Sequence, residues 1–405
     1  MDRPDLAFDF SNLDDDDNDD DRSTLWEQYT KLCYSQVPPI SALSSMKPIL
    51  IGDESNALFP YMQVGKSAPI LLNMLSRIKI ITSLDLSHNT LEANCTQPLI
   101  DFVNVSSLLS SFDISNNPNI GPTAMIRLLT GIQEAPSLES LNISNTGCSS
   151  SVASKIAQVI TGCSNLMRLD ISSCNLSQGG IDIASAMTEG TKLKWLNLSN
   201  NKLYAGGRRF AQALGQSITN AGTLTRLTLS RNAINDESGA VLLRALADSP
   251  SLKHIDLSQN QLNEASGKSL AALIGKTSSL KTVNLSHNPI LNVTINKIRG
   301  QTQAETGDEG ENKKDKKPKG YVPSLYLVIN SLIKNSSMKK LILHGLVVDR
   351  DEWDQKVSAM KASNQTVEIC DNPPTAETLN FVNMVKKAQL AEENKGDEEN
   401  QEETE

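Results

Sequence analysis

Residues 252–262 read LKHIDLSQNQL, and this stretch decides the fold of the chain. Apolar residues occupy its first, fourth, sixth and eleventh positions, and an asparagine occupies the ninth. The same spacing recurs at 81–91 (ITSLDLSHNTL), 193–203 (LKWLNLSNNKL), 224–234 (LTRLTLSRNAI) and 280–290 (LKTVNLSHNPI). A fixed internal period indicates an array of similar units, each of which buries its apolar face against its neighbours.

The period of the array is close to 28 residues. Successive fourth-position residues are separated by 28, 29, 28, 27, 31, 28 and 28 residues, and they are Leu84, Phe112, Leu141, Leu169, Leu196, Leu227, Ile255 and Val283. Between these motifs, apolar residues recur at helical spacing, as Phe210, Leu214 and Ile218 do. We therefore predict an α/β leucine-rich repeat solenoid of about ten repeats, a curved horseshoe with a parallel β-sheet on its concave face and helices on its convex face.

The motif assigns a role to each of its positions. Side chains alternate along a strand, so Ile255 and Leu257 should enter the core while His254, Asp256 and Ser258 face the concave side. The ninth-position asparagine can bond to backbone groups that the turn leaves unpaired. That position is filled by Asn89, Asn117, Asn201, Asn232, Asn260 and Asn288, whereas Thr146 and Cys174 replace asparagine in the third and fourth repeats.

The chain before the repeats divides into two parts. Residues 1–21 include the run Asp14 to Asp21, broken only by Asn18, and are predicted to be a disordered acidic tail. Residues 22–80 are predicted to form an N-terminal helical cap that covers the first core edge of the array. Ser23 should cap its first helix, and Ile49 to Ile51 should form an irregular first strand.

The repeats proper are assigned to 81–298, after which the period breaks. Residues 299–321 are charged and lack an apolar period, which predicts a disordered insertion between repeats. Its lysine run at 313–319 is either a solvated mixed-charge segment or a nuclear-localisation or basic contact sequence. Residues 322–390 should hold the final repeats, with strands near 338–343 and 367–372, and a C-terminal capping helix around 379–385. Residues 391–405 are predicted to be a second acidic disordered tail.

Composition limits the classes of function. The net charge of −9 argues against nucleic acid as the partner, and no apolar run is long enough to span a bilayer. The first ten residues show no signal-peptide pattern, and six scattered cysteines without a CxxC pair indicate reduced thiols. We expect a monomeric protein of the cytoplasm, and also of the nucleus, with neither a membrane span nor a nucleic-acid partner.

Signals for catalysis are weak. The four histidines, His88, His254, His287 and His344, lack a second ligand at metal-binding spacing, and we interpret them as polar residues of the repeat surface. Two Gly-Lys-Ser tripeptides, at 65–67 and 267–269, lack the glycine that opens a phosphate-binding loop. The sequence therefore predicts neither an enzyme nor a cofactor or metal site.

The third position of the motif is the candidate binding site. It is serine in the first three repeats, then Arg168, Trp195, Arg226 and His254, then threonine. Arg231 adds a further cation beyond these four. Tryptophan and arginine are enriched at binding hot spots, and an acidic or mixed protein surface would suit them. The alternative is that arginine only stacks on Trp195 and covers it.

From residue 81 to about 372 the chain resembles the ribonuclease-inhibitor-like class of leucine-rich repeat proteins, on the pattern L-x-x-L-x-L-S-x-N-x-L with long helical segments. That resemblance implies an array that holds another protein. The stretches 86–89 (LSHN), 97–102 (QPLIDF), 116–117 (NN) and 121–122 (GP), with the glutamate-rich tail, resemble the Ran GTPase-activating proteins.

Two departures separate the chain from those activators. The resemblance requires an essential arginine where this chain has Asp85, and a catalytic asparagine where it has Thr146. The leading hypothesis is therefore a non-enzymatic protein-interaction scaffold that uses the concave face. The alternatives are a GTPase-activating protein for a Ran-like small GTPase and an actin- or cytoskeleton-associated regulator, so a small GTPase and a cytoskeletal protein are the candidate partners.

Overall fold

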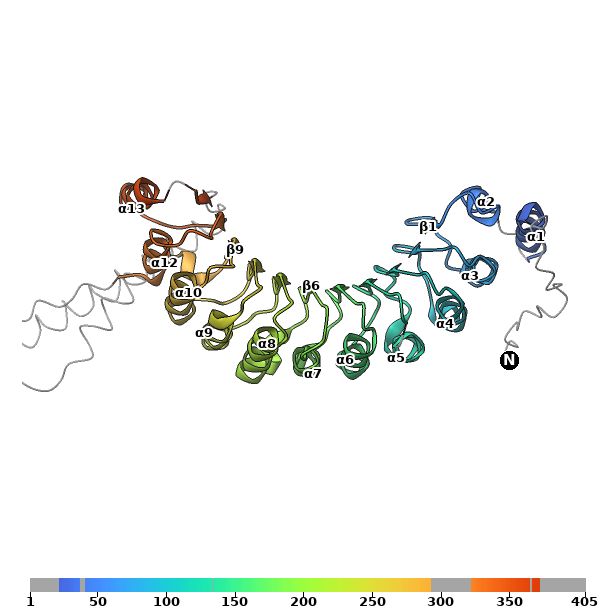
Figure 1. Cartoon of the computed structure of the whole chain (residues 1–405), viewed down its shortest axis with the longest axis horizontal. Coiled ribbons are helices and arrows are strands. Elements are labelled where there is room, and N and C mark those ends of the chain that lie inside the picture. Colours follow the sequence, from blue (N-terminus) through green and yellow to red (C-terminus); the bar gives the residue numbers. More distant parts are fainter. Residues whose placement is uncertain (1–21, 37–40, 134, 293–321, 365, 372–405) are drawn as a thin grey trace, which may run out of the picture.

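The structure of the chain is a computed structural model that describes residues 22–36, 41–133, 135–292, 322–364 and 366–371. Over these residues the chain forms an open arc, with strands along the inner side and helices along the outer side (Figure 1). The strands make one 11-stranded sheet whose spatial order follows the sequence, and every neighbouring pair is parallel. The predicted horseshoe is confirmed.

Every strand of the sheet is three residues long and is centred on an inward-facing residue. Adjacent strands pair in the same register of the motif, third position opposite third position. The strands are β1 (Asn56–Leu58), β2 (Ser83–Asp85), β3 (Ser111–Asp113), β4 (Ser140–Asn142), β5 (Arg168–Asp170), β6 (Trp195–Asn197), β7 (Arg226–Thr228), β8 (His254–Asp256), β9 (Thr282–Asn284), β10 (Lys340–Ile342) and β11 (Glu368–Cys370).

The helices connect the strands and cover the outer side of the arc. They vary more in length than the strands, from the short α2 to the long α8. Their bounds are α1 (Arg22–Tyr34), α2 (Met46–Leu50), α3 (Ala68–Leu75), α4 (Thr96–Val105), α5 (Gly121–Ile132), α6 (Ala153–Gly162), α7 (Gly180–Ser185), α8 (Gly207–Ala221), α9 (Asp236–Ala245), α10 (Glu264–Lys276), α12 (Ser324–Leu332) and α13 (Arg350–Ser363).

The core lies between the sheet and the helices and continues through the whole array. The fourth- and sixth-position residues of β8, Ile255 and Leu257, are buried, as predicted. The helical stripe Phe210, Leu214 and Ile218 is buried on α8. The curvature follows because strands are narrower than helices, so units that stack through both must splay on the helical side.

The N-terminal prediction is partly wrong. Ile49 lies in helix α2, and Ile51 directly follows that helix, so the strand expected there is absent. The first strand is instead β1, which pairs with β2 and places Ala57 opposite Leu84. Helix α1 begins at Arg22, one residue before the expected cap. The segment 56–64 lacks the leucine pattern, so the repeat motif does not predict this strand.

The C-terminal strands occur where they were predicted. β10 pairs with β9 and β11 pairs with β10, so the array resumes in register after the insertion. The predicted tails at 1–21 and 391–405, the insertion at 299–321 and the capping helix near 379–385 lie outside the described residues. Among the described helices, none has the length and apolar character needed to cross a membrane.

Candidate protein-binding face

The fifth position of the motif has a structural role. In β8 the Oδ1 atom of Asp256 accepts hydrogen bonds from the backbone N–H of Ser258 at 2.9 Å and from its hydroxyl at 2.7 Å. Asn197 makes the same pair of bonds with Ser199, at 3.1 and 2.7 Å. These bonds end the strand and fold the chain into the turn. The aspartates and asparagines at the fifth position are therefore part of the framework of the array.

The ninth-position asparagines connect each turn to its neighbour, as predicted. The side-chain amide of Asn232 donates to the carbonyls of Leu198 at 2.9 Å and Leu229 at 3.0 Å. Its Oδ1 atom accepts the backbone N–H of Asn201 at 2.8 Å. Asn232 is buried, so these bonds satisfy backbone groups that water cannot reach.

The third position carries the candidate site. Register pairing places Arg168 beside Trp195, Trp195 beside Arg226, and Arg226 beside His254. Neighbouring strands lie about 4.8 Å apart, so the four side chains form one continuous row on the concave face. We call these four residues the third-position row. Both arginines are exposed, while the tryptophan and the histidine are half-buried.

The arginines of this row have no recorded partner in the described part of the chain. No described carboxylate lies within ion-pair distance of Arg168 or Arg226, and neither stacks over Trp195 in a cation–π contact. The exposed guanidinium groups are thus open to an external acceptor. This arrangement differs from the alternative in which arginine serves only to cover the tryptophan.

The pKa of His254 depends on the positive charges near it on the concave face. Burial lowers the pKa of this histidine, and the positive charges of Arg226, Lys281 and Lys253 lower it further. Three cations therefore act on one imidazole from three consecutive repeats. The local field is positive although the whole chain carries a net charge of −9.

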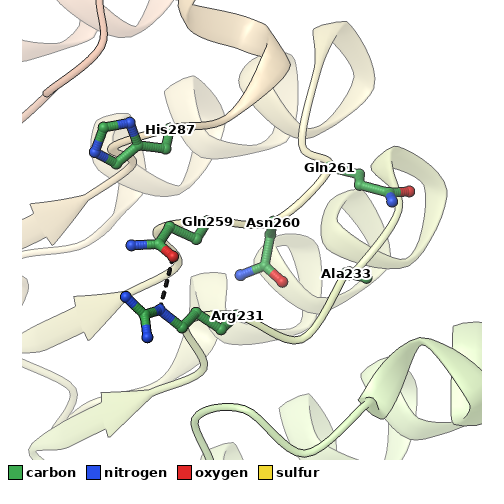
Figure 2. Close-up of a pocket in the computed structure, with 6 residues that line it drawn as sticks. All are labelled: Arg231, Ala233, Gln259, Asn260, Gln261 and His287. Atoms are coloured by element: carbon green, nitrogen blue, oxygen red, sulfur yellow. Dashed lines mark hydrogen bonds between the residues drawn. The ribbon is translucent and has the colours of Figure 1, made fainter. Parts of the chain in front are cut away.

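Arg231 lies apart from the third-position row. It occupies the eighth position, in the turn after β7, with a left-handed backbone (φ 58°), and its Nε–H donates to the Oε1 atom of Gln259 at 2.7 Å. Figure 2 shows this bond, with His287 beyond Gln259 on the next turn. The three side chains border a shallow hollow at the carboxyl ends of the strands, lined as well by Ala233, Asn260 and Gln261.

Of the remaining histidines, His287 is exposed as predicted, whereas His88 and His344 are half-buried. His88 stacks on Tyr61 with ring centroids 4.1 Å apart, and its Nε2 atom lies 3.0 Å from the amide nitrogen of Asn116. His344 is half-buried near Ser286, whose hydroxyl accepts its backbone N–H. No group of three or more metal-ligating side chains occurs within the described ranges.

The two Gly-Lys-Ser tripeptides serve packing. A Cβ atom on Gly65 would meet the carbonyl oxygen of Thr90 at 2.7 Å, and one on Gly267 would meet Oγ of Ser324 at 2.1 Å. Each glycine therefore permits close contact between neighbouring repeats.

The two positions that matter for the GTPase-activator resemblance are engaged in the framework. The Oδ1 atom of Asp85 accepts the backbone N–H of Ser87 at 2.8 Å. Thr146 is buried, and its hydroxyl donates to the carbonyl of Ile143 at 2.8 Å. At these two positions the chain therefore lacks the exposed arginine and asparagine that the resemblance to the activators requires.

Sequence reasoning missed a set of lysines at the second position of the motif. Lys194, Lys253, Lys281 and Lys339 stand there in four repeats, and all four are exposed. Alignment of the repeats contains the signal, because the same column holds Thr82, Ser110 and Glu139 in the earlier repeats.

Comparison with known proteins agrees with the architecture. The family described as "Leucine Rich repeat" matches residues 223–243 and 248–271, which include β7 and β8. The repeated motif, the single parallel sheet and this match identify the chain as a leucine-rich repeat protein. Such arrays are protein-interaction architectures, with partners held on the extended concave surface.

Other comparisons add little about function. A crystal structure of the leucine-rich repeat-containing protein LegL7 from Legionella pneumophila is similar, with 19% sequence identity and a TM-score of 0.45. The match covers 78% of this chain and 89% of that one. No curated protein matches the sequence.

Proposed function

We propose that this protein is a non-enzymatic scaffold of the ribonuclease-inhibitor-like class that binds an acidic surface of a partner protein on its concave face. One observation carries the proposal: the third-position row groups two exposed arginines, a tryptophan and a histidine on four adjacent strands. At the same position β2, β3 and β4 present only serine. Arg231, beyond the row, would contribute at the edge of the contact.

The chemistry of the row suits a protein ligand. Tryptophan supplies a large apolar contact area, and each guanidinium offers paired N–H donors to carboxylates. Asp85 and Thr146 stand where the resemblance requires arginine and asparagine, which supports a scaffold over a GTPase activator. The actin-associated alternative rests on class membership alone.

The test is affinity capture from the native cell with chemical cross-linking, comparing the wild-type chain with the double variant Trp195→Ala, Arg226→Ala. Removal of two hot-spot residues typically costs at least about 2 kcal/mol each, so recovery of the specific partner should fall at least about tenfold. The matched control is Ser83→Ala, Ser111→Ala, at the same motif position on β2 and β3.

The control should recover the partner at the wild-type level, and circular dichroism should show all three proteins folded. Undiminished recovery with the folded Trp195→Ala, Arg226→Ala variant would reject the site. Acceleration of GTP hydrolysis by a Ran-like GTPase at stoichiometric protein would reject the scaffold in favour of the activator.

A further inference from the structure

A continuous strip of cations runs along the amino-terminal ends of the strands in the second half of the array. It consists of Lys194, Arg226, Lys253, Lys281, Lys339 and Lys340, and we call it the basic band. These residues occupy the second or third position of the motif from β6 to β10. Only Arg226 was also part of the third-position row.

Backbone hydrogen bonds fix the order of the band. The N–H of Lys253 donates to Thr225, that of Lys281 to Lys253 at 2.7 Å, and that of Lys339 to Lys281 at 2.8 Å. The N–H of Thr225 in turn donates to Lys194 at 2.9 Å. The band is therefore unbroken across the insertion, with roughly 4.8 Å between successive strands.

Within the described residues the band has little neutralising charge. Its one recorded ion pair joins Lys340 to Glu368 on β11 at 3.1 Å, between two largely solvent-exposed side chains. Asp256 lies on the same face and bonds to Ser258, and it forms no ion pair with a residue of the band. The lowered pKa of His254 shows that the band's charges act together, since Arg226, Lys281 and Lys253 all contribute after burial. An acidic ligand would relieve this repulsion.

The chain itself contains a segment of complementary charge. Residues 391–405 hold eight carboxylates, at positions 392, 393, 397, 398, 399, 402, 403 and 405, and one lysine at 395. The described part of the chain ends just after β11, which pairs with β10 at the end of the band. Residues 372–390 lie between, and a chain of that length can span up to roughly 60 Å. Five strand spacings from β11 to β6 amount to only about 24 Å.

The other acidic run is placed less favourably. Asp14 to Asp21 directly precedes α1, which lies at the opposite end of the arc from α13 (Figure 1). Eight residues extend at most roughly 28 Å, which does not carry them past the first repeats to the far half of the sheet. Position along the arc therefore favours the C-terminal segment.

We propose that residues 391–405 dock on the basic band of the same chain and so compete with acidic ligands for the concave face. The docking stands apart from the proposed function, because it needs no partner protein. Exposed ion pairs are individually weak and are screened by salt. The covalent connection compensates, because it keeps the acidic segment at an effective concentration in the millimolar range.

Zero-length carbodiimide cross-linking of the full chain tests the contact directly, because it joins a lysine amine only to a carboxylate that touches it. At about 50 mM salt, peptide mapping should show cross-links from the 392–405 carboxylates to Lys253, Lys281 and Lys339. In a mixture of isotope-labelled and unlabelled protein, each cross-link should join two peptides of the same label, which shows that it forms within one molecule. About 0.5 M salt should abolish these cross-links. Cross-links only between copies, from Asp14 to Asp21, or to lysines outside the band would overturn the proposal.

A binding experiment tests the band by substitution. A full chain with the eight acidic residues replaced by glutamine or asparagine is titrated with a fluorescent peptide of residues 386–405, in parallel with the same chain carrying Lys253→Ser, Lys281→Ser and Lys339→Ser. The matched control carries Lys66→Ser, Lys268→Ser and Lys361→Ser, three exposed lysines outside the band.

The band variant should weaken peptide binding at least tenfold and the control less than twofold. Equal weakening in both would show that net charge alone attracts the peptide, and that result would overturn the proposal. Both experiments measure only the binding of the chain's own acidic segment. The capture test with Trp195→Ala, Arg226→Ala measures the recovery of a partner protein, so either proposal can fail without the other.

Discussion

At the scale of single residues, two polar columns of the motif behave differently. The ninth-position asparagines are buried and use their side chains to satisfy backbone groups of adjacent turns. The third-position side chains are accessible and do not satisfy backbone groups of the turns. Polar residues at the ninth position therefore stabilise the turns, whereas polar residues at the third position are accessible to a ligand.

Asn232→Ala tests the framework role. The substitution leaves the backbone N–H groups of Asn201 and Leu203 without their Oδ1 acceptor in a buried turn. The carbonyls of Leu198 and Leu229 each lose one donor but keep another, the side-chain amides of Asn201 and Asn260. An unsatisfied buried group costs about 1–3 kcal/mol, so urea denaturation should show a loss of at least about 2 kcal/mol in the free energy of unfolding.

The control for that substitution is Asn330→Ala, on the exposed side of α12. Its effect should stay within about 0.5 kcal/mol, because it removes no buried partner and favours the helix. A loss below about 1 kcal/mol for Asn232→Ala would show that water or backbone rearrangement replaces the side chain.

At the scale of elements, one helix caps the next. Asp236 lies in the first turn of α9, and its carboxylate accepts backbone N–H groups of Asn263, Ala265 and Ser266 at 2.8–2.9 Å, at the start of α10. These N–H groups have no partner within their own helix. A side chain from one repeat therefore fixes where the helix of the following repeat begins.

The capping bonds also set the ionisation of the carboxylate. Burial raises the pKa of Asp236, but the N–H groups of Ser266, Ala265 and Asn263 and the hydroxyl of Ser266 lower it more, so the pKa falls below its usual 3.8. A depressed pKa in the folded state gives stability that is present above about pH 4. That stability is lost as the pH falls through the folded-state pKa.

Asp236→Ala should therefore lower the free energy of unfolding at pH 7 by about 1–2 kcal/mol, the usual cost of a lost cap. The difference from wild type should shrink below pH 3.8 in pH-resolved urea denaturation. Asp182→Ala, an exposed acidic residue in the first turn of α7, is the control and should change stability by less than about 0.5 kcal/mol. A difference that persists unchanged at low pH would contradict the charge-dependent cap.

At the scale of the whole molecule, the array continues across the insertion. β9 pairs with β10 in register, placing Thr282 opposite Lys340. Helix α12 packs on α10, where the N–H of Ser324 donates to Glu264 at 3.0 Å and the absent side chain of Gly267 makes room for Ser324. The repeats before and after the insertion therefore contact each other directly, through β9 and β10 and through α10 and α12.

Replacing residues 299–319 with an eight-residue Gly/Ser linker should leave the array intact. Loop length changes the closure entropy only slowly, so the free energy of unfolding should change by about 1 kcal/mol or less. A loss above about 3 kcal/mol would show that the replaced residues pack on the array.

Gly267→Val supplies the contrasting variant. A Cβ atom at this position would lie 2.1 Å from Oγ of Ser324 and 2.6 Å from Cδ1 of Ile290, so the larger side chain must push α12 away from α10. Overpacking of this kind costs typically about 1–3 kcal/mol. The same urea denaturation should therefore report a loss for Gly267→Val that the linker replacement does not show.

The sequence by itself determined the repeat, its register and the third-position row, because a motif that recurs at constant spacing must stack its equivalent positions side by side. It missed β1, whose residues lack the leucine pattern. It also placed Arg231 beyond the row, but it did not show that the turn carries this residue to the carboxyl ends of the strands and into a bond with Gln259.

Only the tertiary structure decided how charges from different repeats combine. Lys281 and Lys339 are 58 residues apart in the chain, yet their backbones are joined by one hydrogen bond at the amino-terminal edge of the sheet. Alignment of the repeats shows the column of lysines, but the pairing of β9 with β10 is what carries the basic band across the insertion. The physical reason is that the sheet brings together residues of equal motif position whatever length of chain lies between them.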